Sequence, residues 1–81
     1  MDKDKDLINK VDQTLDLLSE GISNLLMSMK NTEQRVNAIK KMPNPPSTQM
    51  LRIVKNKAIE KQDFETCEAL KIYSEEKGID L

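Results

Sequence analysis

The sequence predicts an all-α protein, and three observations support that prediction. Apolar residues recur at alternating intervals of three and four through the first half of the chain, which is the spacing of a helical seam. Three prolines within residues 43–46 then interrupt any helix. After them, capping residues and helically spaced apolar residues predict two shorter helices. We therefore expect a long amphipathic helix over 1–42, a Pro-rich turn over 43–47 and an αα-hairpin over 48–81, within one structural domain.

The composition favours elongated helices or an oligomer. The chain has 81 residues, of which 37% are hydrophobic, 33% charged and only 2% aromatic, so the large side chains that dominate core packing are almost missing. A domain of this size buries only about 60% of the surface of its unfolded chain. With one cysteine and no histidine, the chain also lacks disulfides and His-containing metal sites that could stabilise it. Association with another chain would supply the missing burial.

The first expected element is a heptad-patterned, coiled-coil helix from about residue 6 to residue 41. With Ile8 at heptad position a, apolar residues fill positions a and d for more than four heptads, with Thr32 as the one polar interruption. A seam of this length predicts a homo-oligomer. The residues expected to form the oligomer interface are Ile8, Val11, Leu15, Leu18, Ile22, Leu25, Met29, Val36 and Ile39.

The positions beside the seam argue against a simple parallel zipper. Few of the charged pairs that specify parallel dimers stand at positions e and g. Instead, position g holds the small residues Thr14, Gly21 and Ser28, which suits a bundle in which each helix contacts more than one neighbour. Other apolar residues off the seam either contact such a neighbour or pack against the chain's own C-terminal part, and these are Leu17, Leu26 and Met27.

The prolines predict the end of the long helix. Proline lacks the amide hydrogen and moves the residue before it out of the α region, so a helix cannot continue through residues 43–46. A run this rich in proline is semi-rigid and sets a direction change. We prefer this interpretation to that of a Pro-rich ligand for a partner domain.

The second expected helix begins at a cap formed by Ser47 or Thr48 and ends near residue 61. Its inner face would hold Met50, Leu51, Val54, Ala58 and Ile59.

Asp63 is the expected N-cap of the third helix, and Gly78 is expected to end it. Ile79, directly after that glycine, is placed to contact Tyr73. Three apolar residues are expected to hold the hairpin together: Phe64, Leu70 and Tyr73.

The hairpin sequence from Ala58 to Lys71 resembles the UVR motif of excision-repair subunits and Clp-associated adaptors. In that family a helical hairpin carries an alanine five residues before Asp-Phe-Glu, then a leucine and a basic residue. The residues at these places are Ala58, Asp63, Phe64, Glu65, Leu70 and Lys71.

The resemblance covers roughly residues 47–77 and has departures. Cys67 and Glu68 stand where the family favours alanines, and Ile72 where an acidic residue is usual. The resemblance implies pairing with another helical hairpin through protein–protein contacts, without catalysis or metal binding.

The residue types present exclude most enzyme chemistry. Without histidine the chain lacks the commonest general base and zinc ligand, and with only Gly21 and Gly78 it has no Gly-rich phosphate loop. Cys67 falls on the apolar side of a helix, where a thiol is usually a small buried hydrophobe. We therefore expect no catalytic residue, no metal site and no cofactor. A single cysteine and the absence of a signal-peptide pattern favour the cytoplasm, and no apolar stretch is long enough for membrane insertion.

The charges are segregated along the chain. Residues 1–29 carry six acidic and three basic side chains. Residues 30–61 carry two acidic and eight basic side chains, and residues 62–81 carry six acidic and two basic ones. We expect a non-enzymatic module that self-associates and binds a protein partner as an adaptor, inhibitor or regulator, as small phage and bacterial accessory proteins do. The candidate partner contacts are Lys55, Lys61, Glu65, Glu68 and Lys71.

The alternative is an accessory protein associated with nucleic acid. A basic patch that folds close together would engage phosphates, although the acidic pI near 5.4 and the scarcity of aromatics argue against it. The residues of this patch are Lys40, Lys41, Arg52, Lys55, Lys57 and Lys61.

Overall fold

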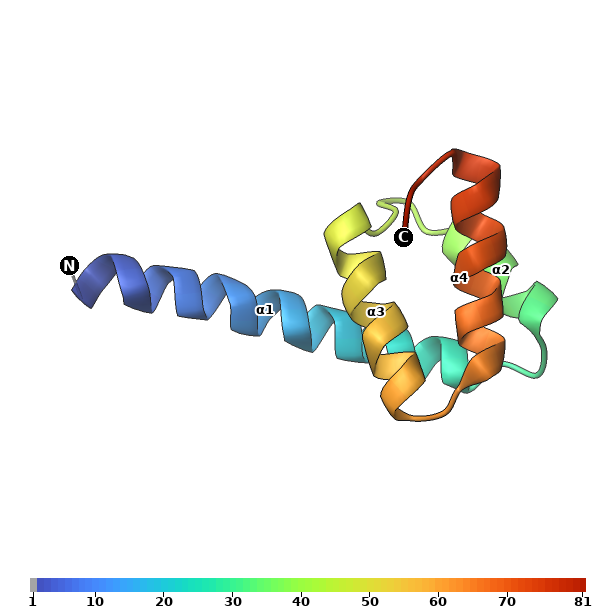
Figure 1. Ribbon diagram of the computed structural model, residues 1–81, viewed down its shortest axis with the longest axis horizontal. Helices are drawn as coiled ribbons and strands as arrows, with labels where there is room; N and C mark the ends of the chain where they lie inside the picture. Colours follow the sequence, from blue (N-terminus) through green and yellow to red (C-terminus); the bar gives the residue numbers. More distant parts are fainter. Residues whose placement is uncertain (1) are drawn as a thin grey trace.

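The chain folds into helices only, so the predicted all-α class is confirmed (Figure 1). The computed structural model describes the backbone of residues 2–81 and the side chains from residue 13 onward. Over this part of the chain no residue is in a strand. The helices are α1 (Asp2–Met27), α2 (Thr32–Lys40), α3 (Thr48–Glu60) and α4 (Phe64–Lys77).

The prediction of one continuous helix from residue 6 to residue 41 is wrong, because the chain bends at residues 28–31. Asn31 has an extended backbone and caps α2, its side chain accepting a hydrogen bond of 2.8 Å from the amide of Gln34. The Gln34 side chain in turn accepts a 3.1 Å hydrogen bond from the amide of Lys30. This reciprocal pair resembles a capping box and starts a new helix at Thr32, the one polar position of the expected seam.

The bend places the two halves of the N-terminal region against different partners. The C-terminal half of α1 packs against α3, and α2 packs against α4 (Figure 1). Toward its N-terminus α1 extends beyond the other three helices. Residues 41–47, which include the three prolines, lie outside the helices and connect α2 to α3.

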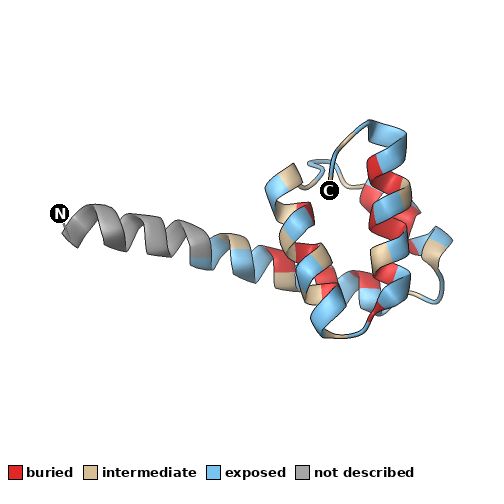
Figure 2. Ribbon diagram, in the orientation of Figure 1, coloured by how far each residue is buried: buried red, intermediate tan, exposed pale blue. Residues whose placement is uncertain are grey.

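All four helices contribute to one apolar core (Figure 2). Because Leu26 is fully buried in it, the interpretation that an off-seam residue packs against the chain's own C-terminal part is confirmed for Leu26. Leu17 and Met27 are instead 71% and 46% exposed. The core residues are Leu26, Ile39, Leu51, Val54, Leu70 and Tyr73.

The helix caps of the C-terminal half are confirmed. The Ser47 side chain accepts a hydrogen bond from the amide of Met50, and Asp63 caps α4. Gly78 has the left-handed φ of 67° that ends α4, and the amide of Ile79 donates a 2.8 Å hydrogen bond to the carbonyl of Ser74. Ile79 is half-buried against the core cluster, to which Tyr73 belongs.

Two expectations for the hairpin's apolar residues are corrected. Phe64 is 68% exposed, because the inner side of the first turn of α4 is taken by Asp63 and Thr66. Ile59 is 50% exposed at the end of α3. Leu70 is fully buried, so hairpin packing rests on it and on Tyr73.

Candidate interaction surfaces

One face of α1 presents large apolar side chains to solvent. Leu18 and Leu25 are 53% and 47% exposed, Leu15 on the same face is half-buried, and Ile22 is half-buried with part of its side chain packed against the chain's own core. We call these four residues the α1 row. Each belongs to the seam that the sequence predicts. Exposed apolar groups gathered on one helix face are typical of a surface that contacts another chain.

The other residues of the expected seam do not join this face. Val36 and Ile39 are 5% and 0% exposed, since the bend turns α2 toward α4 and places them in the chain's own core. Their assignment to an oligomer interface is therefore corrected. Met29 is half-buried in the bend, and the assignments of Ile8 and Val11 lie outside the described side chains.

The side of α1 that flanks the α1 row at heptad position e is covered by the chain itself. Ser19, Ser23 and Leu26 are all 0% exposed where α1 packs against α3. The small serines let the two helix backbones approach. This side of α1 is therefore closed to a second chain.

Gly21 lies beside the α1 row, and no contact within the described part of its own chain requires a glycine at this position. It is exposed in the middle of a helix, and a Cβ atom built there would meet nothing within 4 Å. Glycine inside a helix costs about 1 kcal/mol relative to alanine. No packing or backbone conformation in the described chain offsets that cost.

Lysines of α3 fix its position on α1. Lys57 Nζ lies 3.0 Å from Asp16 Oδ1 and from Glu20 Oε2, and Lys61 Nζ donates a 2.7 Å hydrogen bond to Glu20 Oε1. These contacts raise the pKa of Lys57, through Asp16 and then Glu20, and lower the pKa of Glu20, through Lys61 and then Lys57. Lys61, a candidate partner contact, thus connects two helices of its own chain.

A buried arginine joins the bend to the start of α4. Arg35 Nη1 donates to Asp63 Oδ1 at 2.5 Å and to Thr66 Oγ1 at 2.9 Å, while Nη2 donates to the carbonyl of Met29 at 2.9 Å. Glu65, another candidate partner contact, lies at the edge of this group, 3.3 Å from Arg35 Nη2. Arg35 therefore holds the bent chain in place.

Burial alone would raise the pKa of Asp63, but the hydrogen bonds from Thr66 and Arg35 outweigh it and lower that pKa below its ordinary value. Sequence reasoning missed this group because Arg35 falls at heptad position g of the expected helix, where the spacing indicates no buried partner. Asp63 was identified only as a cap. Nothing local in the sequence links two residues that lie 28 positions apart.

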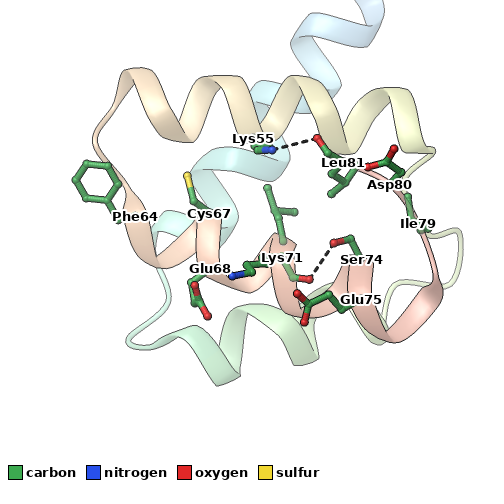
Figure 3. A pocket seen from close by; sticks show the side chains of 11 residues that line it. Lys55, Phe64, Cys67, Glu68, Lys71, Ser74, Glu75, Ile79, Asp80 and Leu81 are labelled. Carbon is green, nitrogen blue, oxygen red and sulfur yellow. Dashed lines mark hydrogen bonds between the residues drawn. The ribbon is translucent and has the colours of Figure 1, made fainter.

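A groove of about 590 Å³ lies between α3, α4 and the C-terminal segment (Figure 3). Three of the five candidate partner contacts line it together, namely Lys55, Glu68 and Lys71. Leu70 forms part of its apolar lining, and Phe64 stands at one end with its ring turned outward. The groove therefore combines charged walls with apolar surface.

Cys67 also lines the groove, and its chemistry favours an inert thiol. Burial, followed by the nearby Asp63 carboxylate, raises the pKa of this half-buried side chain. The nucleophilic thiolate is thus disfavoured at neutral pH. Among the residues whose side chains are described, no group of three or more His, Cys, Asp or Glu could hold a metal ion.

The basic residues of the nucleic-acid alternative do not form an open patch. Lys40 pairs with Glu76 at 2.5 Å, and Lys57 and Lys61 pair with acidic residues of α1. Arg52 and Lys55 donate hydrogen bonds to the backbone oxygens of the C-terminal segment. Lys41 and Arg52 are exposed with no acidic side-chain partner among the described residues, and Arg52 is engaged by the backbone alone.

None of the described helices is long and apolar enough to cross a membrane. Comparison with protein-family models, curated proteins and solved structures finds no match for this chain.

Proposed function

We propose that this protein is a non-enzymatic interaction module that self-associates through the α1 row and binds a protein partner with its α3–α4 hairpin. The observation that carries the proposal is the exposure of Leu18 and Leu25 on one face of α1. Full burial of a leucine contributes about 1.5–3 kcal/mol. Covering the exposed halves of these leucines in two copies therefore favours association.

The hairpin supplies a second surface. Phe64 is the most exposed aromatic residue of the described chain, at 68%, and Ile59 precedes the same turn with 50% exposure. Exposed aromatic side chains near an apolar groove are frequent anchors in protein interfaces. The UVR resemblance supports the same surface, since it implies pairing with another helical hairpin.

Analytical ultracentrifugation of the full chain over a range of concentrations tests self-association. We expect the sedimenting mass to rise above that of one chain as concentration increases, with helicity by circular dichroism unchanged. A single-chain mass at all concentrations would refute assembly through the α1 row. The hairpin would then be the one surface left for the proposed interaction.

An adaptor, an inhibitor or a regulator could each use such a pair of surfaces. Measuring binding to a generic DNA duplex at low salt tests the nucleic-acid alternative. We expect none, because nearly all the basic residues of that patch are engaged within the chain.

A further inference from the structure

We infer that the α1 row binds the α1 row of a second copy of this chain in antiparallel orientation, with Gly21 of each copy beside the two-fold axis. The inference rests on the proposed self-association and specifies its geometry.

The residue spacing of the α1 row is the same in both chain directions. Successive members are separated by three, four and three residues, so reversing the helix exchanges Leu15 with Leu25 and Leu18 with Ile22. In an antiparallel pair each half-buried member of one copy then lies opposite an exposed leucine of the other. Two identical rows are therefore self-complementary, as an interface with two-fold symmetry requires.

The charge of this face favours a second copy over a charged partner. The α1 row and the small residues beside it, Thr14, Gly21 and Ser28, include no ionisable side chain. Two copies thus meet without repulsion, and a charged partner finds no opposite charge there. In an antiparallel pair the two helix macrodipoles point in opposite directions, which is favourable. In a parallel pair they point the same way and repel.

The covered side of α1 distinguishes the two orientations. In a parallel pair, residues at position g lie against position e of the partner, but the e residues Ser19 and Leu26 are 0% exposed beneath α3. In an antiparallel pair, position g meets position g on one flank and the covered e positions lie together on the other, so one whole flank stays open for contact. Gly21 then faces Gly21 of the second copy, and Thr14 faces Ser28. The small side chains permit close approach, which gives the unexplained glycine a role.

Disulfide trapping in the full chain tests this geometry. All variants carry Cys67→Ala, and circular dichroism and sedimentation first establish that this background is helical and associates. Thr14→Cys and Ser28→Cys are each oxidised alone and as a mixture, with one of the two labelled with ¹⁵N so that mass spectrometry separates mixed from like pairs. A disulfide forms only where the two Cβ atoms approach within about 4.5 Å.

We expect a disulfide between Thr14→Cys and Ser28→Cys in the mixture and none for either variant alone, whereas Gly21→Cys should form one with itself. Disulfides between like copies of Thr14→Cys, or no disulfide in any sample, would overturn the antiparallel arrangement while the measured association preserves the proposed function. A background that stays a single chain in sedimentation would overturn both.

Discussion

Arg35 of α2 and Asp63 at the start of α4 form a buried ion pair, with 2.5 Å between Nη1 and Oδ1 and side chains only 6% and 7% exposed. The same guanidinium donates a hydrogen bond to the carbonyl of Met29, so one residue connects the bend, α2 and α4. Among the ion pairs of the described side chains, the Arg35–Asp63 pair is the one in which both partners are buried.

Replacing Asp63 should therefore destabilise the fold strongly. Asp63→Asn retains a capping oxygen but leaves Arg35 without its buried counter-charge, and we expect a loss of about 3 kcal/mol in the free energy of unfolding, measured by urea denaturation. Glu65→Gln is the matched control, because Glu65 is 58% exposed and its loss should cost less than about 1 kcal/mol. Equal effects of the two substitutions would show that the buried pair has no special role.

The lowered pKa of Asp63 predicts a loss of stability in acid. A carboxyl group whose pKa is depressed in the folded state stabilises the fold above its unfolded value, here 3.8, and that stability disappears as pH falls through the folded pKa. The free energy of unfolding should thus decrease below about pH 4. The decrease should be smaller in Asp63→Asn, which has no proton to gain at this site. Parallel pH profiles for the two proteins would contradict the assignment to Asp63.

Charge on the α1 row should abolish self-association. Leu18→Asp or Leu25→Asp would bury an unpaired carboxylate between two copies, so we expect a single-chain mass by sedimentation with helicity retained. Leu17→Asp is the matched control, since Leu17 is 71% exposed on another side of the same helix and should leave the mass unchanged. Association that survives both row substitutions would exclude the α1 row as the interface.

The two glycines should respond to alanine in opposite directions. Gly21→Ala adds a methyl group in open space and should raise the stability of the monomeric fold by up to about 1 kcal/mol. Gly78→Ala forces alanine into a left-handed conformation at φ +67° and should lower it by about 1 kcal/mol. Thermal unfolding at low protein concentration compares the two, and changes of the same sign would contradict the assigned conformations.

Replacing Phe64 should change the free energy of unfolding much less than replacing Leu70, because Phe64 is a surface residue and Leu70 a core residue. Phe64→Ala should change the free energy of unfolding by less than about 0.5 kcal/mol, because most of its ring is already in water. Leu70→Ala should cost about 2–5 kcal/mol, since Leu70 is fully buried in the core. A large loss from Phe64→Ala would restore the role in hairpin packing that the sequence suggested for it.

Local features of the fold could be predicted from the sequence, and tertiary ones could not. The caps at Ser47, Asp63 and Gly78 each act within a few residues, so their residue types reveal them. The bend had a local signal too, in Asn31 and Gln34, but the continuous heptad spacing concealed it.

The candidate surfaces were predicted in part for the same reason. Periodicity identifies apolar positions on a helix, as it did for Leu18 and Leu25, but it cannot tell which of them the chain will cover itself. Val36 and Ile39 have the same spacing and were covered by α4. The burial of Arg35 depends on α4 in the same way, and only the assembled structure reveals it.

The bend at residues 28–31 also constrains the order in which the segments can fold during synthesis. The helices on its two sides, α1 and α2, dock on a hairpin that the ribosome makes later, so both leave the ribosome before their partners exist. Until residue 77 has emerged, Leu26, Val36 and Ile39 have no core to enter and remain as accessible as Leu18 and Leu25. The nascent chain therefore displays the whole heptad seam for a time, and completion of the hairpin withdraws its second half.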